Sequence, residues 1–346
     1  MRSKLLILLL LVANTLYAAD IIPQPRSVVE GNGDYLLGAK ATLVCDKELA
    51  DAADYLLSYL PLRKVSSKRG DVRLVLDDKL QSEEYQLRID TRGVEVRGGG
   101  YGGVFNGVQT LLQLMPSEVY AKSLKLPVKV GHIVVSDAPR YAYRGFLLDV
   151  ARTYMPLHEV KRAIDYMAFL KLNKLHFHLV DNTGWRIEIK SHPELAKVGG
   201  WRGGDSPIHP VYGSFFEKYG GYYTQDELRE VVKYAAQRNV EVIPEIDVPG
   251  HSKGLGAVRP DILCGYVPDT TITNGIDTRN VWCASKESNY RLIEDIVKEV
   301  AEIFPSEYIH IGGDEVNFNW WRQCPDCQRL CKEKGITVGP QLRSIC

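Results

Sequence analysis

The sequence has no excess of charge of either sign, because 43 Lys and Arg residues balance 43 Asp and Glu residues in a chain of 346. A binding surface for nucleic acid or for an anionic membrane requires clustered positive charge, which this balance does not indicate. Long apolar runs are also missing beyond the first residues, so no later segment is expected to cross a membrane. The length suffices for about two domains with a large core.

The apolar run near the start, Leu5 to Ala13, follows a short basic segment and precedes small residues at Ala18 and Ala19. This order is typical of a secretory signal peptide. A retained membrane anchor is the alternative, but the run is short for a bilayer span. We therefore expect residues 1–19 to be removed and the protein to be exported, to the periplasm or outside the cell.

Cysteine is too scarce to form the scaffold of the fold, with seven residues in the whole chain. Cys324-x-x-Cys327 with Cys331 is similar to half of a zinc site, but no second such pair and no histidine pair lies nearby in the sequence. A local disulfide or free thiols are the favoured interpretation. Cys264 and Cys283 are a second candidate for a disulfide, and the odd count leaves at least one thiol without an internal partner.

Residues 20–138 have the pattern of a small α+β domain. Alternating apolar residues predict strands over 71–76, 85–89 and 94–97, and an apolar face predicts a helix over 104–114. The glycine-rich run from Gly98 to Gly103 is no dinucleotide fingerprint, because no acidic residue follows a second strand at the required place.

From residue 139 to 346 the sequence pattern predicts strands and helices that alternate along the chain. The strands are expected over 145–150, 174–180, 240–246 and from 308, and the helices over 157–170, 224–239 and 289–303. Thr224-x-x-Glu227 is a capping box that opens the second of these helices. Near-continuous apolar strands that alternate with helices indicate parallel βα units, with each strand covered on both faces. Polar residues follow every strand, which is where a (β/α)8 barrel keeps its active site. We predict the first four units of such a barrel; an open doubly wound sheet is the alternative.

The fourth strand ends in an unusual way, His310-Ile-Gly-Gly-Asp-Glu-Val316. Neighbouring side chains of a regular strand point to opposite faces, so Asp314 and Glu315 can share one pocket only where the chain bends. The two glycines before them permit such a bend. Two acids are therefore expected to converge at the end of this strand.

Four motifs in order resemble those of the family 20 glycoside hydrolases, the β-N-acetylhexosaminidases: Arg144-Gly-x-x-x-Asp149-Val-Ala-Arg152, His176-Phe-His-Leu-Val-Asp181, Pro244-Glu-Ile-Asp247-Val-Pro-Gly-His251 and His310-Ile-Gly-Gly-Asp314-Glu315. The front domain is similar too, through Ile22-Pro-Gln-Pro and 107–114. The resemblance implies exo-acting hydrolysis of terminal, non-reducing β-linked GlcNAc or GalNAc in oligosaccharides or glycoconjugates. It implies no cofactor and no metal.

The resemblance also implies roles for single residues. In this family the acetamido oxygen of the sugar is the nucleophile, so two protein carboxylates of the usual kind are not needed. Glu315 is then the general acid and later the base, and Asp314 orients the acetamido group. Arg152 binds the outer sugar hydroxyls, Asp181 and His251 form a relay that supports Glu315, and Asp247 holds the loop that carries His251.

Three further residues of the motifs are given structural roles. Arg144 precedes its strand, on the stability face of a barrel, and His176 and His178 share one strand face, where packing and hydrogen bonding are expected. After Asp181 the family usually has an acid and a glutamine, whereas Asn182-Thr183 stands here, which is expected to alter the loop.

Two other interpretations stay open. Only four βα units precede Cys346, so we expect a fragment of a longer enzyme, with an edge strand and an apolar face uncovered. Such a fragment could be an inactive carbohydrate-binding remnant. Alternatively, His176 and His178 could be metal ligands of a barrel hydrolase, with Asp247, His251 or Asp314 completing the shell.

Overall fold

The computed structural model describes residues 20–208, 217–265 and 281–344. The expected signal peptide lies outside the described residues. The chain divides into two compact units. The first ends at Arg144 and also takes in residues 165–173 and 237–239, and the second comprises the other residues.

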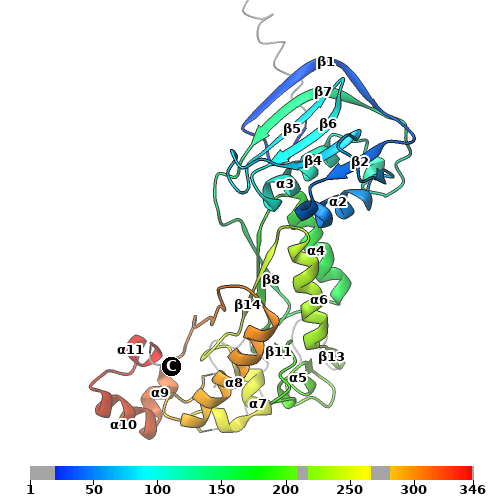
Figure 1. The fold of residues 1–346 in the computed structure, drawn as a ribbon. Helices are drawn as coiled ribbons and strands as arrows, with labels where there is room; N and C mark the ends of the chain where they lie inside the picture. The colour runs from blue at the N-terminus through cyan, green and yellow to red at the C-terminus, as the bar shows by residue number, and fades with distance from the viewer. Residues whose placement is uncertain (1–19, 209–216, 266–280, 345–346) are drawn as a thin grey trace, which may run out of the picture. The chain divides into compact units, whose positions relative to one another are not determined.

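The first unit is built on a seven-stranded sheet with the order β1-β7-β5-β6-β4-β2-β3 (Figure 1). Its strands are β1 (Ser27–Leu37), β2 (Thr42–Cys45), β3 (Arg63–Lys64), β4 (Val72–Leu76), β5 (Tyr85–Asp90), β6 (Gly93–Gly98) and β7 (Val128–Asp137). Its α-helices are α2 (Ala50–Leu57) and α3 (Tyr101–Gln113), with 3-10 turns over Lys47–Leu49 and Ser117–Val119. The three predicted strands and the predicted helix are confirmed, although the helix begins three residues and ends one residue earlier than expected.

The core of this unit lies between the sheet and α3. Strands β5 and β6 form an antiparallel hairpin, with Leu87 opposite Val96. Both side chains are fully buried, as is Val108 on the helix. Burying side chains of this size contributes about 1.5–3 kcal/mol each to folding.

The second unit contains a parallel sheet with the order β14-β9-β8. Strands β8 (Gly145–Asp149), β9 (Lys174–His178) and β14 (Glu241–Glu245) are paired in parallel, which confirms the predicted βα units. The intervening and following helices are α4 (Leu157–Phe169), α6 (Gln225–Ala236) and α8 (Glu287–Ile303). The shorter elements are β10 (Val180–Asp181), β11 (Gly184–Trp185), α5 (Glu194–Lys197), β12 (Trp201–Arg202), β13 (Tyr219–Gly220), α7 (Lys253–Val258), the 3-10 turn η4 (Pro260–Ile262), α9 (Asn319–Gln323), α10 (Pro325–Lys334) and α11 (Pro340–Arg343).

The start of α6 shows how the local sequence determines an element boundary. The backbone N–H of Thr224 donates to the Glu227 carboxylate at 2.7 Å, and the Glu227 N–H donates to the Thr224 hydroxyl at 3.2 Å. These reciprocal bonds satisfy donors that the first helical turn leaves free. The predicted capping box is confirmed.

Two expectations for the parallel sheet were wrong. The fourth strand is only a single parallel bridge, between Glu245 and His310, although the N–H of His310 donates to the carbonyl of Pro244 at 2.9 Å. Strand β8 is not covered on both faces, since Phe146 and Leu147 are exposed. Within the described residues β8 is an edge strand with one neighbour, which leaves its outer side chains accessible.

Arg144 has the structural role expected of it. Its guanidinium forms two bonds with the carboxylate of Glu83, at 2.7 and 3.0 Å, and donates to the carbonyl of Lys171 at 2.7 Å. A forked guanidinium suits such two-point recognition.

Within the described residues, no helix combines the length and apolar content of a membrane span.

Candidate active site

The strand register aligns polar residues at the C-terminal ends of the parallel strands. Asp149 of β8 lies opposite His178 of β9, which lies opposite Glu245 of β14, and Glu245 is bridged to His310. Each of the four βα segments thus contributes one polar residue to a single row. Sequence analysis predicted polar strand ends, but it did not predict this alignment.

Glu245 is the centre of that row and is a site residue that sequence analysis missed. One carboxylate oxygen accepts hydrogen bonds from His176 and His178 at 2.7 and 2.5 Å, and the other lies 3.0 Å from His310. Burial alone would raise the pKa of Glu245, but the hydrogen bond from His178 and the histidine charges lower it. Glu245 could have been recognised in the sequence, because it is a charged residue within an apolar strand and stands two residues before Asp247.

His178 is held by acids on both sides. Its Nδ1 lies 2.5 Å from Glu245 and its Nε2 lies 3.0 Å from Asp181. Burial acts to lower the pKa of His178, but these hydrogen bonds raise it to about 10. Both ring nitrogens of His178 face carboxylates, an arrangement that fits the hydrogen-bonding role expected of this residue.

The bend expected before the two acids is present. Gly312 and Gly313 have φ angles of 61° and 90°, in the left-handed region, and a Cβ at Gly312 would approach the Asp247 carboxylate to 1.9 Å. Beyond this bend Asp314 and Glu315 both turn toward one group, the Nε2 of His251, at 3.5 Å each. The predicted convergence of the two carboxylates is confirmed.

His251 is buried between acids. Its Nδ1 lies 3.4 Å from Asp181, so that Asp181, His251 and Glu315 form a continuous chain of polar groups. The hydrogen bond to Asp181 raises the pKa of His251 to about 9, although burial acts in the opposite direction. The imidazole is therefore charged at neutral pH. Asn182, at the position where the family pattern is broken, lies 3.3 Å from the same Nδ1.

Asp181 stays ionised although it is buried. Burial would raise its pKa, but hydrogen bonds from His178 and His251 and the charge of Arg152 hold it well below the usual range. Arg152 is fixed between this carboxylate, at 2.8 Å, and that of Asp149, at 2.9 Å. The Arg152 side chain is 38 % exposed, so its guanidinium can still reach a ligand.

Asp247 has a hydrogen-bond partner that was not predicted from the sequence. Its carboxylate accepts a hydrogen bond from the backbone N–H of Gly313 at 3.0 Å, and its other oxygen is 4.0 Å from His251. Asp247 therefore holds the bend that presents Asp314 and Glu315, and its expected role in holding the loop that carries His251 stays a prediction. Burial is the main cause that raises the pKa of Asp247 to about 7.

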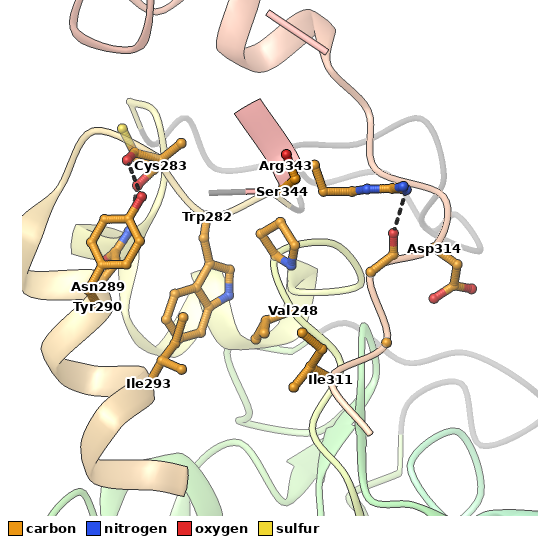
Figure 2. A pocket seen from close by; sticks show the side chains of 14 residues that line it. Val248, Trp282, Cys283, Asn289, Tyr290, Ile293, Ile311, Asp314, Arg343 and Ser344 are labelled. Atoms are coloured by element: carbon orange, nitrogen blue, oxygen red, sulfur yellow. Dashed lines mark hydrogen bonds between the residues drawn. The ribbon is translucent and has the colours of Figure 1, made fainter. Parts of the chain in front are cut away.

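All six predicted site residues belong to one cluster, and a cavity of about 500 Å³ opens beside it. Figure 2 shows Trp282, Val248 and Ile311 on the apolar part of its wall. The side chain of Arg343 donates to the carbonyl of Gly313 at 3.0 Å. Of the predicted site residues, Asp314 is the one that lines this cavity in the described part of the chain.

The charged state of His251 leads to a prediction on stability. Since its pKa rises from 6.5 to about 9 on folding, the folded protein binds this proton more tightly than the unfolded chain does. The stabilisation is complete below pH 6.5 and is lost as the pH approaches 9. We expect the free energy of unfolding, measured in urea, to decrease by about 3 kcal/mol over this interval for His251 alone.

The matched variants are His251→Asn and His158→Asn, since His158 is an exposed histidine. His251→Asn should make the decrease between pH 6.5 and 9 shallower, with the contribution of His178 remaining, and His158→Asn should leave the pH dependence unchanged. An equally steep decrease in the His251 variant would contradict the assignment of this proton.

The site and the fold agree with the comparisons to known proteins. The profile of glycosyl hydrolase family 20, catalytic domain, matches residues 141–345, and that of glycosyl hydrolase family 20, domain 2, matches residues 18–138. The chain belongs to glycosyl hydrolase family 20.

Its relatives include the beta-hexosaminidases of Vibrio furnissii and Porphyromonas gingivalis, which are 37% and 36% identical over 94% of this chain. These matches cover 53% and 42% of the relatives, so the chain spans about half their length. Among solved structures, a family 20 exo beta-N-acetylglucosaminidase from Vibrio harveyi in complex with N-acetylglucosamine superposes with a TM-score of 0.86 at 34% identity, over 94% of this chain and 51% of that one. A Streptomyces plicatus N-acetyl-beta-hexosaminidase superposes with a TM-score of 0.77 at 35% identity. This match covers 94% of the present chain and 64% of the Streptomyces chain.

Proposed function

We propose that this chain is part of an exo-acting β-N-acetylhexosaminidase that removes terminal, non-reducing β-linked GlcNAc or GalNAc by substrate-assisted catalysis. The observation that carries the proposal is the convergence of Asp314 and Glu315 on the buried, charged His251. The relatives named beta-hexosaminidase and the neighbour with bound N-acetylglucosamine support the sugar class.

The reaction requires two different chemical roles of the adjacent acids, proton transfer by Glu315 and stabilisation of the acetamido group by Asp314. The acetamido oxygen of the sugar attacks the anomeric carbon while the glycosidic C–O bond breaks, and Glu315 gives its proton to the leaving oxygen. Asp314 accepts the acetamido N–H and stabilises the positive charge of the oxazolinium intermediate. Glu315 then takes a proton from the water that opens this ring, so the product retains its configuration.

The remaining residues support these two. Arg152, held by Asp149 and Asp181, binds the outer hydroxyls of the sugar with its forked guanidinium. The chain from Asp181 through His251 places a positive charge 3.5 Å from Glu315, where it stabilises the carboxylate that remains after proton transfer. Asp247 keeps the bend in place through Gly313.

We further propose that residues 139–346 are the N-terminal part of a (β/α)8 barrel and supply its first four βα units. A separate α+β domain occupies 20–138. The profile matches at 141–345 and 18–138 support this division. Residues 1–19 are proposed to direct export to the periplasm or the outside of the cell.

The test compares nitrophenyl glycosides with and without the 2-acetamido group. The enzyme of which this chain is proposed to be part should release nitrophenol from the β-N-acetylglucosaminide and β-N-acetylgalactosaminide. The β-glucoside, which lacks the acetamido nucleophile, should react at least about 10³-fold more slowly. A thiazoline analogue of the intermediate should inhibit strongly. Equal rates for all three substrates would refute substrate assistance, and calorimetric binding of the thiazoline without any turnover would favour a carbohydrate-binding remnant.

A further inference from the structure

We propose that four cysteines of the second unit bind one structural zinc ion: Cys264, Cys283, Cys324 and Cys327. None of the residues of this four-cysteine cluster is one of the predicted site residues, although Cys283 also lines the cavity beside them. The proposal does not rest on the proposed hydrolase activity. All four sulfur atoms lie within 4.8 Å of one another. No second C-x-x-C pair lies near Cys324-x-x-Cys327 in the sequence, as stated above. In the folded chain, however, Cys264 and Cys283 lie beside it.

The distances between the sulfur atoms are those of a metal shell. A tetrahedral site with Zn–S bonds of about 2.3 Å has sulfur-to-sulfur edges of about 3.8 Å. The Cys327 sulfur lies 3.6 Å from Cys264 and 3.6 Å from Cys283, and Cys283 lies 3.9 Å from Cys324. A disulfide instead joins two sulfurs at about 2.05 Å. None of the three sulfur-to-sulfur distances given above is as short as a disulfide bond.

The surroundings suit thiolate ligands. Cys324 is the N-cap of α10 and Cys327 lies in its first turn, where the positive end of the helix dipole stabilises thiolates. Cys283 and Cys327 are buried in a small apolar core with Trp321 and Leu342. The hydroxyl of Ser285 lies 3.2 Å from the Cys283 sulfur, as an outer hydrogen-bond partner of a ligand would.

The ion would join two segments that flank the acidic pair. The chain runs from Glu315 through α9 to Cys324, and the indole N–H of Trp321 on α9 donates to the Trp282 carbonyl at 2.8 Å. Trp282 precedes Cys283, and its own indole N–H donates to Ser252, the neighbour of His251, at 2.7 Å. Binding at the four-cysteine cluster would therefore fix α9 and α10 against the loop beside His251.

The experiment begins with the unmodified chain, purified without chelator or reductant. Elemental analysis should find about one zinc per chain. Exchange for Co²⁺ should give the thiolate-to-cobalt and d–d absorption bands of a tetrahedral sulfur site. Removal of zinc should lower the Tm by at least about 5 °C. Absence of metal, iron in place of zinc, or an intact mass that is lower because the four thiols are joined in disulfides would overturn the proposal.

The variants locate the ion. Cys327→Ser should lose zinc, whereas Cys331→Ser should keep it, since Cys331 is buried on the same helix but does not belong to the cluster. Ser285→Ala should weaken zinc binding by about 10-fold or more. Retention of a full zinc equivalent by Cys327→Ser would exclude the site, and if that variant does not fold, the metal content and cobalt spectrum of the unmodified chain still decide.

Discussion

Replacing Glu315 by Gln is expected to lower kcat/KM by about 10²–10⁴-fold for substrates with a sugar leaving group. The amide cannot give a proton to the leaving oxygen, yet it has the same size and the same backbone preference. The backbone preference matters because Glu315 has a φ of 47° in the left-handed region. The loss should be smaller for nitrophenyl substrates, whose leaving group needs less protonation. The measurement is kcat/KM for both substrate types.

Glu307→Gln is the matched control, since Glu307 is exposed and lies on the same segment before the bridge to His310. It should leave both rates unchanged. A uniform loss in Glu315→Gln, independent of the leaving group, would assign Glu315 to positioning and not to proton transfer. The distinction is useful because the Glu315 side chain is 49% exposed in the structure.

Local features of the fold could be predicted from the sequence because they depend on neighbouring residues. Apolar periodicity predicted α8 to within two residues, and the Thr224 and Glu227 pair predicted the start of α6. The bend at Gly312 and Gly313 was also predictable, since only glycine adopts such φ angles without strain.

Features that depend on strand register could not be predicted. Glu245 became a site residue only when β14 paired with β9 and brought it opposite His178. In the same way, Asp247 finds the N–H of Gly313 across a long stretch of chain. The four-cysteine cluster needs Cys283 to approach the start of α10, and no sequence spacing encodes that approach.

Arg186 illustrates a residue whose importance appears only in the structure. Its side chain is fully buried and donates to carbonyl oxygens of three separate segments: Val150 at 2.9 Å, Ala151 at 2.7 Å, Gly221 at 3.0 Å and Gly200. Burial is the main cause that lowers the pKa of Arg186 to about 10, so it remains charged at neutral pH. A planar group with five N–H donors can satisfy several carbonyls at once, which no other side chain does.

Arg186→Met is therefore expected to reduce the free energy of unfolding by about 3–5 kcal/mol, measured by urea denaturation. Methionine keeps the length and the apolar contacts but leaves the buried carbonyls without this donor. Arg229→Met, at an exposed arginine of α6, should change stability by less than about 0.5 kcal/mol. Because Val150 and Ala151 directly precede Arg152, residual folded Arg186→Met should also bind N-acetylhexosamines more weakly. Stability equal to that of the Arg229 variant would mean that water or rearranged backbone satisfies those carbonyls, and that Arg186 does not organise this end of the sheet.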